Sequence, residues 1–322
     1  MSHCLANFRR HRSGFSLVEV LVSMVVLILL ILFVTQLVNS TSAVTVNSRK
    51  RMDADSQART VFDRLAADFE GMLLRPDVDY IFAKMQGNDK MFFYSEAPAY
   101  FSGSPLSQDR GSVSLVGYRI NPNLMPALQL ERLGKGLTWT GTPTGSAGGA
   151  VTFLTYPSVS ASPSPATSPA PTPFPTSTLA GNWSSVIGTP AGYDDGADSD
   201  YHELSPGVFR FEYCFQLKNG LFSDKPYYST HTAPQGMRDV SAIIVAIAIL
   251  DDTSRKIVSS TDRMVAALDD FSGVDLSGTT ALMATLWQNK VNSPTFAQDI
   301  GLPKTAASSV RIYQRYFRLS TK

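Results

Sequence analysis

The most prominent hydrophobic pattern is an unbroken apolar run near the N-terminus. Residues 15–38 read FSLVEVLVSMVVLILLILFVTQLV and follow a basic leader. About 20 consecutive apolar residues are enough to cross a bilayer as a helix, so the run predicts one transmembrane segment. A single carboxylate, Glu19, occupies its fifth position. An ionisable group near a bilayer centre costs roughly 2.5–3.5 kcal/mol, so it usually has a partner and a function.

An amphipathic continuation follows the apolar run. Residues 39–47 are rich in Ser, Thr and Val, which are weak helix formers, so we expect a loosened or kinked section there. Apolar residues then recur at helical spacing: Val61, Phe62, Leu65, Ala66, Phe69, Met72 and Leu73. Arg64 and Asp68 are spaced to pair along the helix. Pro76 predicts that the helix ends near Arg75, so residues 39–75 are expected to continue the N-terminal helix.

The remaining residues, 76–322, are expected to form one strand-rich head. Five stretches predict strands: Val113–Ile120, 128–133, 151–156, Val208–Leu217 and 240–250. The last stretch is apolar throughout, rich in Ile and Val, and too short to span a membrane, so it predicts a central buried strand. Residues 251–254 then predict a turn, after which residues 256–259 are expected to return as a partner strand.

Helical patterns reappear toward the C-terminus. Thr261 or Ser260 is expected to cap a helix that extends through Phe271, and residues 280–290 form a second candidate. Residues 310–319 fit either a strand or a helix. We favour a strand because three side chains share one side of it: Tyr313, Phe317 and Leu319. A long helix on an antiparallel-rich sheet is an α+β fold.

Two segments are not expected in the core. Residues 157–178 contain seven prolines among Ser, Thr and Ala, and proline cannot donate a hydrogen bond to a strand ladder. This insertion predicts an extended linker or surface loop. Residues 134–149 are rich in Gly and Thr and predict a second flexible excursion.

Charge and cysteine content narrow the class of protein. The chain has 28 basic and 27 acidic residues, so no global basic field for nucleic acid exists, and no nucleic-acid partner is expected. Of two cysteines, Cys4 lies in the leader and Cys214 in a strand-like run. A disulfide framework is therefore not expected, and Cys214 predicts a buried free thiol.

Enzymatic motifs are missing from the sequence. His202 and His231 lie in unlike contexts, and there is no zinc-protease, nucleophile-elbow or phosphate-loop motif. We expect no catalytic residues and no enzymatic activity.

One acidic stretch is a candidate metal site. Alternating carboxylates suit Ca²⁺, which takes six to eight oxygen ligands. The candidate ligands are Asp194, Asp195, Asp198 and Asp200. Gly196 precedes two of them, so the order is not that of an EF-hand loop. A solvated acidic loop remains the alternative, and no other cofactor is expected.

A basic stripe near the C-terminus has two readings. Arg311, Arg315 and Arg318 lie among aromatic residues. They either contact a partner subunit or cover a sheet face with their apolar stems.

Residues 14–22, GFSLVEVLV, resemble the cleavage and methylation motif of type IV prepilins and type II secretion pseudopilins. The resemblance implies that a prepilin peptidase cuts after Gly14 and N-methylates Phe15. It also implies that Glu19 pairs with the terminal amine of a neighbouring subunit during assembly. Pairing two charges in hydrocarbon is far better than leaving either alone. A signal peptide has an apolar core of only 7–15 residues, so it does not explain this run.

The head has a looser resemblance. Residues 58–69, Val116–Gly117–Tyr118–Arg119–Ile120 and Leu130–Glu131–Arg132 are similar to parts of J-type minor pseudopilins. Residues 313–317 are similar to large prepilin-like proteins encoded in multi-gene pilin cassettes. The resemblance implies a pilin-like fold and a minor structural subunit that joins or initiates a secretion or pilus-like filament. The alternatives are a minor type IV pilin with an adhesive or DNA-uptake role, and an uncleaved membrane-anchored binding or sensor protein.

The same resemblance implies a location and partners. The leader, residues 1–14, is expected in the cytoplasm, and the head in the periplasm or outside the cytoplasm, with a single pass through the inner membrane. Loss of the leader removes three arginines and changes the net charge from +1 to −2. The expected partners are the prepilin peptidase, other pilin or pseudopilin subunits, the inner-membrane assembly platform and the lipid bilayer.

Overall fold

The computed structural model describes residues 16–74, 78, 80–100, 110–121, 129–138, 151–152, 201–228, 237–258, 261–270 and 282–319. The chain divides into two compact units, Met1–Arg51 and Met52–Lys322. Each unit is described by itself. The boundaries that the sequence suggests at residues 14 and 38 remain predictions.

One helix, α1 (Leu17–Glu70), runs through the first unit and into the second. The loosening expected at residues 39–47 is not observed, because all of them lie within α1. The hydroxyls of Thr41 and Thr45 donate to the carbonyls of Leu37 and Thr41 at 2.8 and 2.9 Å. These bonds to carbonyls one turn back satisfy the two hydroxyls within the helix.

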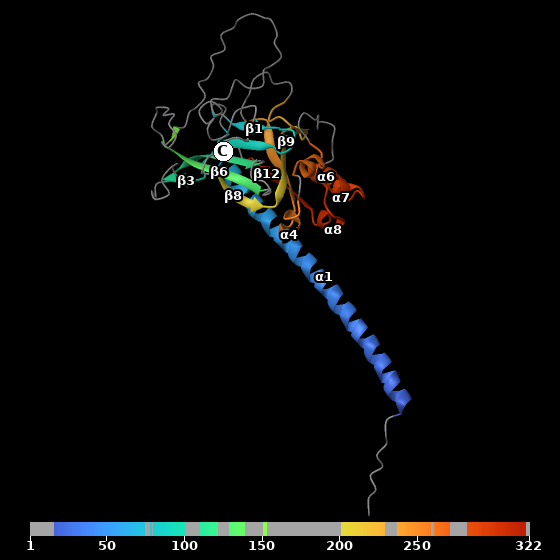
Figure 1. The fold of residues 1–322 in the computed structure, drawn as a ribbon. Coiled ribbons are helices and arrows are strands. Elements are labelled where there is room, and N and C mark those ends of the chain that lie inside the picture. Colours follow the sequence, from blue (N-terminus) through green and yellow to red (C-terminus); the bar gives the residue numbers. More distant parts are fainter. Residues whose placement is uncertain are drawn as a thin grey trace, which may run out of the picture. The chain divides into compact units, whose positions relative to one another are not determined.

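The second unit contains two main sheets (Figure 1). The first has the order β1–β2–β5–β6–β7, and β8 also pairs with β6. Its strands are β1 (Ile81–Ala83), β2 (Lys90–Ser95), β5 (Val113–Ile120), β6 (Gln129–Thr138), β7 (Val151–Thr152) and β8 (Tyr201–Pro206). Its described pairings are antiparallel except β6 with β7. A two-stranded sheet pairs β3 (Ala99–Tyr100) with β4 (Arg110–Gly111).

The second main sheet has the order β10–β9–β11–β12 and is antiparallel throughout its described pairs. Its strands are β9 (Val208–Leu217), β10 (Phe222–Ser223), β11 (Val240–Ile249) and β12 (Arg311–Arg318). The central strand β11 is almost completely buried, as its continuous apolar composition predicts.

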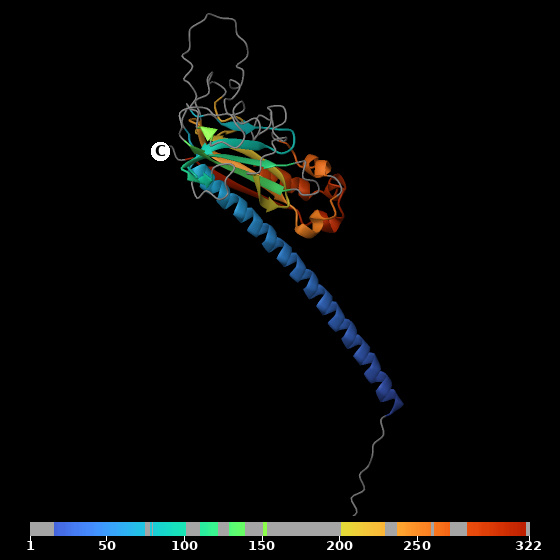
Figure 2. The same cartoon turned by 60° about the vertical axis from the view of Figure 1, so that its left-hand side comes forward.

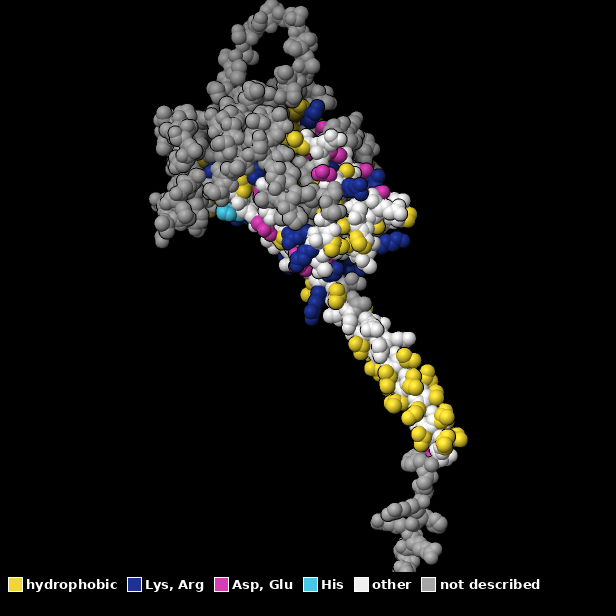
Figure 3. Space-filling model, in the orientation of Figure 1, with side chains coloured by type: hydrophobic (Ala, Val, Ile, Leu, Met, Phe, Trp, Pro, Cys, Tyr) yellow, Lys and Arg dark blue, Asp and Glu magenta, His cyan; other side chains and the backbone are white. Residues whose placement is uncertain are grey.

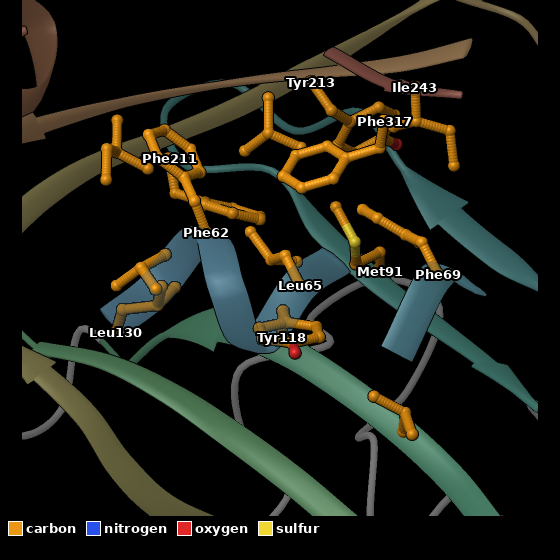
Figure 4. Close-up of a cluster of buried hydrophobic side chains, with 14 of the residues drawn as sticks. Phe62, Leu65, Phe69, Met91, Tyr118, Leu130, Phe211, Tyr213, Ile243 and Phe317 are labelled. Carbon is orange, nitrogen blue, oxygen red and sulfur yellow. The ribbon is translucent and has the colours of Figure 1, made fainter. Parts of the chain in front are cut away.

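Residues 52–70 of α1 lie between the two sheets (Figure 4). Phe62, Leu65 and Phe69 face a core that includes side chains from both sheets. The second sheet contributes alternate residues of β9 and β11 together with Phe317 of β12. The rings of Phe69 and Phe317 are 5.2 Å apart, in the range of favourable aromatic pairs. The helical period of the sequence therefore selects the face of α1 that fills the core.

Short helices form a further layer against the other face of the second sheet. In Figures 1 and 2 these orange and red helices gather on one side of the head. They are α4 (Asp252–Arg255), α5 (Thr261–Ala266), α6 (Met283–Val291), α7 (Phe296–Asp299) and α8 (Lys304–Ala307). Trp287 of α6 is fully buried there with Ile244 and Ala246 of β11.

The predicted α+β, pilin-like class is confirmed: a long N-terminal helix packs on antiparallel sheets. The strands predicted at Val113–Ile120 and Val208–Leu217 match β5 and β9, and the C-terminal strand is confirmed as β12. The strand expected at 128–133 is longer, because β6 continues through Gly134 to Thr138. Residues 134–138, which were predicted to begin a flexible excursion, are therefore part of a strand.

Other boundaries require correction. Helix α1 ends at Glu70 rather than near Arg75, because Leu73 already donates its N–H to the carbonyl of Tyr94 in β2. The return strand predicted at 256–259 is wrong for its described part. Asp251 caps α4 by accepting hydrogen bonds from two backbone N–H groups, and β11 pairs instead with β9 and β12.

The predicted C-terminal helices are present with shifted ends. The helix expected through residue 271 ends at Ala266, and Thr261 is its first residue rather than its cap. The second helix, α6, covers Met283–Val291. The Pro-rich insertion at 157–178 and residues 153–156 lie outside the described residues.

Candidate functional site

The assembly segment predicted from the sequence is described from Ser16 onward. Gly14 and Phe15 lie outside the described residues, so cleavage and methylation remain predictions. The carbonyl of Ser16 accepts from the N–H groups of Glu19 at 3.0 Å and Val20 at 3.2 Å, and α1 begins there. Glu19 lies in the first turn of α1, where the helix dipole favours a carboxylate.

The apolar part of α1 is exposed. Its large side chains are exposed from Leu17, at 80%, to Val38, at 54%. Figure 3 shows these yellow side chains along the first part of the helix. By length and composition α1 is the single helix, among the described residues, that can cross a membrane. A helix that is apolar all round requires an apolar environment.

Polar groups inside the apolar segment are satisfied within the helix. The hydroxyl of Ser23 donates to the carbonyl of Glu19 at 2.7 Å, and that of Thr35 to Ile31 at 2.8 Å. These bonds give each hydroxyl an acceptor within the helix, and the hydrocarbon of a bilayer provides none. The Glu19 carboxylate differs from them, because no described residue pairs with its side chain.

A buried charge network joins the end of α1 to the first sheet. Asp68 is fully buried. Arg132 of β6 donates to both of its carboxylate oxygens, from Nε at 2.7 Å and from Nη2 at 2.9 Å. The hydroxyl of Tyr118 in β5 donates to the same carboxylate, and Arg64 lies 3.3 Å from it on the preceding turn. Bidentate contacts between arginine and a carboxylate are among the stronger polar interactions in proteins.

The backbone of α1 is attached at the same point. The hydroxyl of Ser95 in β2 donates to the carbonyl of Asp68 at 2.9 Å. Burial, together with the charge of Asp68, raises the pKa of Tyr118 well above its usual value, so its hydroxyl remains a donor. We call Arg64, Asp68, Tyr118 and Arg132 the Asp68 anchor.

A second ion pair lies across β5 and β6. Arg119 and Glu131 are cross-strand partners, both almost completely buried, with Nε and Oε2 3.0 Å apart. The guanidinium of Arg119 also lies 3.6 Å from the ring centre of Tyr201 in β8. The segments at residues 116–120 and 130–132, which contain Arg119 and Arg132, are therefore in neighbouring strands of one sheet.

A third buried cluster connects the β1–β2 turn to β9. Lys84 donates to the carboxylate of Asp89 and, at 2.6 Å, to the carbonyl of Tyr213. Asp89 in turn accepts the N–H of Tyr213 at 3.1 Å. Glu212 pairs with Arg210 and lies 3.9 Å from Lys84. The side chains of Asp89 and Glu212 are fully buried.

Burial changes the acidity of groups on β9. It raises the pKa of Glu212 to about 8, and the nearby charge of Asp89 adds to the effect, while Lys84 and Arg210 oppose it. Burial likewise raises the pKa of Cys214 to about 12, and the predicted buried free thiol is confirmed. Glu212 and Cys214 are both buried, and the bonds of Lys84 and Asp89 to Tyr213 join the β1–β2 turn to β9.

The calcium hypothesis is not tested by the structure. Asp194, Asp195, Asp198 and Asp200 all lie outside the described residues. Within the described ranges, no group of three His, Cys, Asp or Glu side chains is arranged to hold a metal ion. The acidic stretch as a calcium site remains a prediction.

The sequence predicted the Arg64–Asp68 pair but not Tyr118 or Arg132 as partners. A signal was available, because Asp68 follows Val61 and Leu65 on the apolar stripe of the helix. A carboxylate at a core-facing position must be paired when it is buried. The strand residues that pair with it come from positions 50 and 64 residues later, which helical spacing cannot indicate.

Comparison with known proteins adds one match. The family model of the prokaryotic N-terminal methylation motif matches residues 9–35. The matched stretch contains Gly14, Phe15 and Glu19 together with most of the exposed apolar helix. No curated protein matches the chain.

Proposed function

We propose that this chain is a minor, non-enzymatic structural subunit of a type II secretion or type IV pilus-like filament. The premise is its methylation motif, which indicates the type IV pilin and pseudopilin family without resolving the subfamily and implies processing by a prepilin peptidase. Proteins of this family are typically non-enzymatic. The motif and the apolar helix together suggest a membrane anchor with an extracytoplasmic head.

The observation that carries the proposal is the exposed apolar half of α1 with Glu19 in its first turn. A helix surface that is apolar all round and exposed requires lipid or other subunits to cover it. A filament of packed helices provides such an environment once the subunit leaves the bilayer.

The proposed assembly step pairs two charges. Cleavage after Gly14 breaks the Gly14–Phe15 peptide bond and frees an amine at Phe15. The carboxylate of Glu19 in one subunit then pairs with the amine of a neighbour. In hydrocarbon, this pair is much more stable than either separate ion.

The Asp68 anchor supports the second part of the proposal. Assembly at the apolar half of α1 is useful only if the helix is firmly attached to the head. The buried core around Leu65 and the four-residue anchor provide that attachment within the second unit. We propose that α1 is both the assembly element and a structural element of the head.

Two measurements test the proposed function. Mass spectrometry of the native protein is expected to find N-methyl-Phe15 as its first residue. Intact residues 1–14 would contradict the filament proposal and favour an uncleaved anchored protein.

The second measurement follows incorporation into filaments. Glu19→Ala is expected to be inserted and cleaved normally but to be depleted from sheared filaments by about tenfold or more, since one lost ion pair of about 1.4 kcal/mol suffices. Glu70→Ala is the matched control, because Glu70 is exposed at the other end of α1. Equal incorporation of both variants would remove the assigned role of Glu19.

The acidic stretch provides a separate proposal. We propose that Asp194, Asp195, Asp198 and Asp200 bind Ca²⁺ through their carboxylates. Calorimetry of the full chain in detergent is expected to show one saturable event that is lost when Asp198 and Asp200 are changed to Asn. A flat titration would leave a solvated acidic loop.

A further inference from the structure

We propose that the outer edge of β12 docks an extended acidic segment of a partner protein, which adds to the second sheet as a further strand. Strand β12 is the last strand in the order β10–β9–β11–β12. Among the described residues, no strand pairs with its other side. The proposal concerns β12 of the second unit and goes beyond the assembly role of Glu19.

The hydrogen-bond phase of β12 determines which groups face outward. The N–H of Leu319 donates to the carbonyl of Ser241, and the pairing with β11 continues without a register shift from Arg318 to Arg311. In an antiparallel pair, alternate residues bond to the neighbouring strand. Four residues therefore direct their N–H and C=O groups away from β11: Ile312, Gln314, Tyr316 and Arg318.

Strand β12 carries charge but is neither short nor bulged. Natural edge strands are commonly very short, charged, bulged or interrupted by proline, because an open row of backbone groups invites pairing with other chains. Strand β12 covers Arg311–Arg318, contains no proline and has a regular register. By contrast, the pairing of β11 with β9 on its other side contains two register shifts.

The strand is also held rigidly before any partner arrives. Phe317 is buried against Phe62 and Phe69 of α1. The hydroxyl of Tyr313 donates to Asp55 at 2.6 Å. On the other face, the side-chain oxygen of Gln314 accepts the N–H of Ala284 at 3.0 Å. A preformed edge lowers the ordering cost of binding.

Charge identifies the chemistry of the occupant. Strand β12 carries Arg311, Arg315 and Arg318 and no acidic residue. Arg315 already lies 2.9 Å from Asp63, and Arg311 donates to carbonyls of its own segment. Arg318 is exposed and forms no ion pair with a described residue. Arg318 lies on the opposite face of β12 from Arg315, because side chains alternate along a strand. An added strand with carboxylates on the Arg318 face complements Arg318.

A second copy of the chain is a poorer occupant. Pairing two β12 edges would bring together six arginines without a carboxylate from either strand. Like charges on adjacent strands destabilise their pairing. The arginines thus disfavour self-pairing and favour an acidic partner, which is the behaviour expected of a selective docking edge.

The test uses the full chain in detergent and a labelled peptide in which glutamate alternates with valine. Fluorescence anisotropy is expected to show saturable binding, and the same peptide with lysine in place of glutamate is expected to bind at least about tenfold more weakly. On binding, the amides of Gln314 and Tyr316 are expected to become protected from hydrogen exchange, whereas those of Tyr313 and Arg315 are protected already.

Two variants examine the backbone and the charge separately. Tyr316→Pro removes an outward N–H without removing a bond to β11, and is expected to weaken peptide binding about tenfold, with Tyr316→Phe as control. Arg318→Glu is expected to weaken it about fivefold or more. Lys304→Glu, at an exposed residue of α8, makes the same change in charge and is expected to have no effect.

The outcomes separate cleanly. No saturable binding, equal binding of the lysine peptide, or unchanged protection of Gln314 and Tyr316 would overturn the proposal. Self-association of the chain through β12, seen by analytical ultracentrifugation and abolished by Tyr316→Pro, would also overturn it in favour of a second copy. Hydrogen exchange of Gln314 and Tyr316 is measured on the unmodified chain. It therefore tests the proposal even if Tyr316→Pro does not fold.

Discussion

The two halves of α1 have the same backbone conformation but opposite surroundings. From Leu17 to Val38 the helix is apolar on every side and exposed, whereas in residues 52–70 only one stripe is apolar and that stripe is buried. The head satisfies the narrow stripe with its own two sheets. The all-round apolar surface can be satisfied only by lipid or other molecules.

The two carboxylates on the apolar faces of α1 show the same difference. Asp68 is fully buried and has partners from three elements of its own chain. Among the described residues, Glu19 has no side-chain partner. An acid paired within the chain stabilises the fold, and one without such a partner is available to a neighbouring molecule. This contrast supports the different roles that we assign to them.

The largest expected effect comes from breaking the Asp68 anchor. Asp68→Ala leaves Arg64, Tyr118 and Arg132 without their shared acceptor, so the free energy of unfolding of the head should fall by about 3–5 kcal/mol. Urea unfolding of the full chain measures this change. Asp63→Ala, one turn earlier and exposed, should cost less than about 1 kcal/mol. Equal losses of unfolding free energy in the two variants would contradict the prediction that the buried acid contributes more than the exposed one.

The next effect compares one substitution in both halves of α1. Leu65→Ala should destabilise the head by about 2–5 kcal/mol, because it removes a fully buried side chain from between the sheets. Leu30→Ala should leave head unfolding unchanged, since Leu30 is exposed and outside that core. Unfolding in the same detergent compares the two variants. A similar loss for Leu30→Ala would contradict the division between the halves.

A pH effect is expected from Glu212. Its pKa of about 8 in the fold lies above the ordinary value of 4.5. The stabilisation from the protonated Glu212 carboxyl is therefore complete below pH 4.5 and is lost as the pH rises toward 8, at about 1.4 kcal/mol per pH unit. Glu212→Gln should flatten this slope in unfolding measured from pH 5 to 8. Glu203→Gln, at an exposed position, is the control, and an unchanged slope in Glu212→Gln would refute the assignment.

The smallest effect is expected at the surface of the α1–β12 contact. Arg315 and Asp63 are both well exposed, so Arg315→Ala should reduce the free energy of unfolding by only about 0.2–1 kcal/mol. The loss should shrink further at high salt, since exposed pairs are screened. A loss above about 2 kcal/mol, measured in the same urea titration, would show that this pair belongs with the buried anchor.

Much of the architecture follows from local patterns. The apolar run predicted a transmembrane helix, and α1 is long and apolar enough there to cross a membrane. The helical stripe predicted which residues of α1 enter the core. Uniform burial of β11 follows from its unbroken Ile, Val and Ala composition. The predicted end of α1 near Arg75 was wrong. The helix ends at Glu70 because Leu73 donates its N–H to Tyr94 of β2, and not because of Pro76.

The sequence alone determined the apolar N-terminal helix, its single acid and the methylation motif, because each depends on residues that are close together in the chain. Only the tertiary structure decided that Asp68 is shared by Tyr118 and Arg132, and that β12 ends its sheet with an open edge. Those features depend on strands meeting α1 from distant positions. Local spacing carries no information about such meetings, since they are selected by burial and hydrogen-bond satisfaction over the whole head.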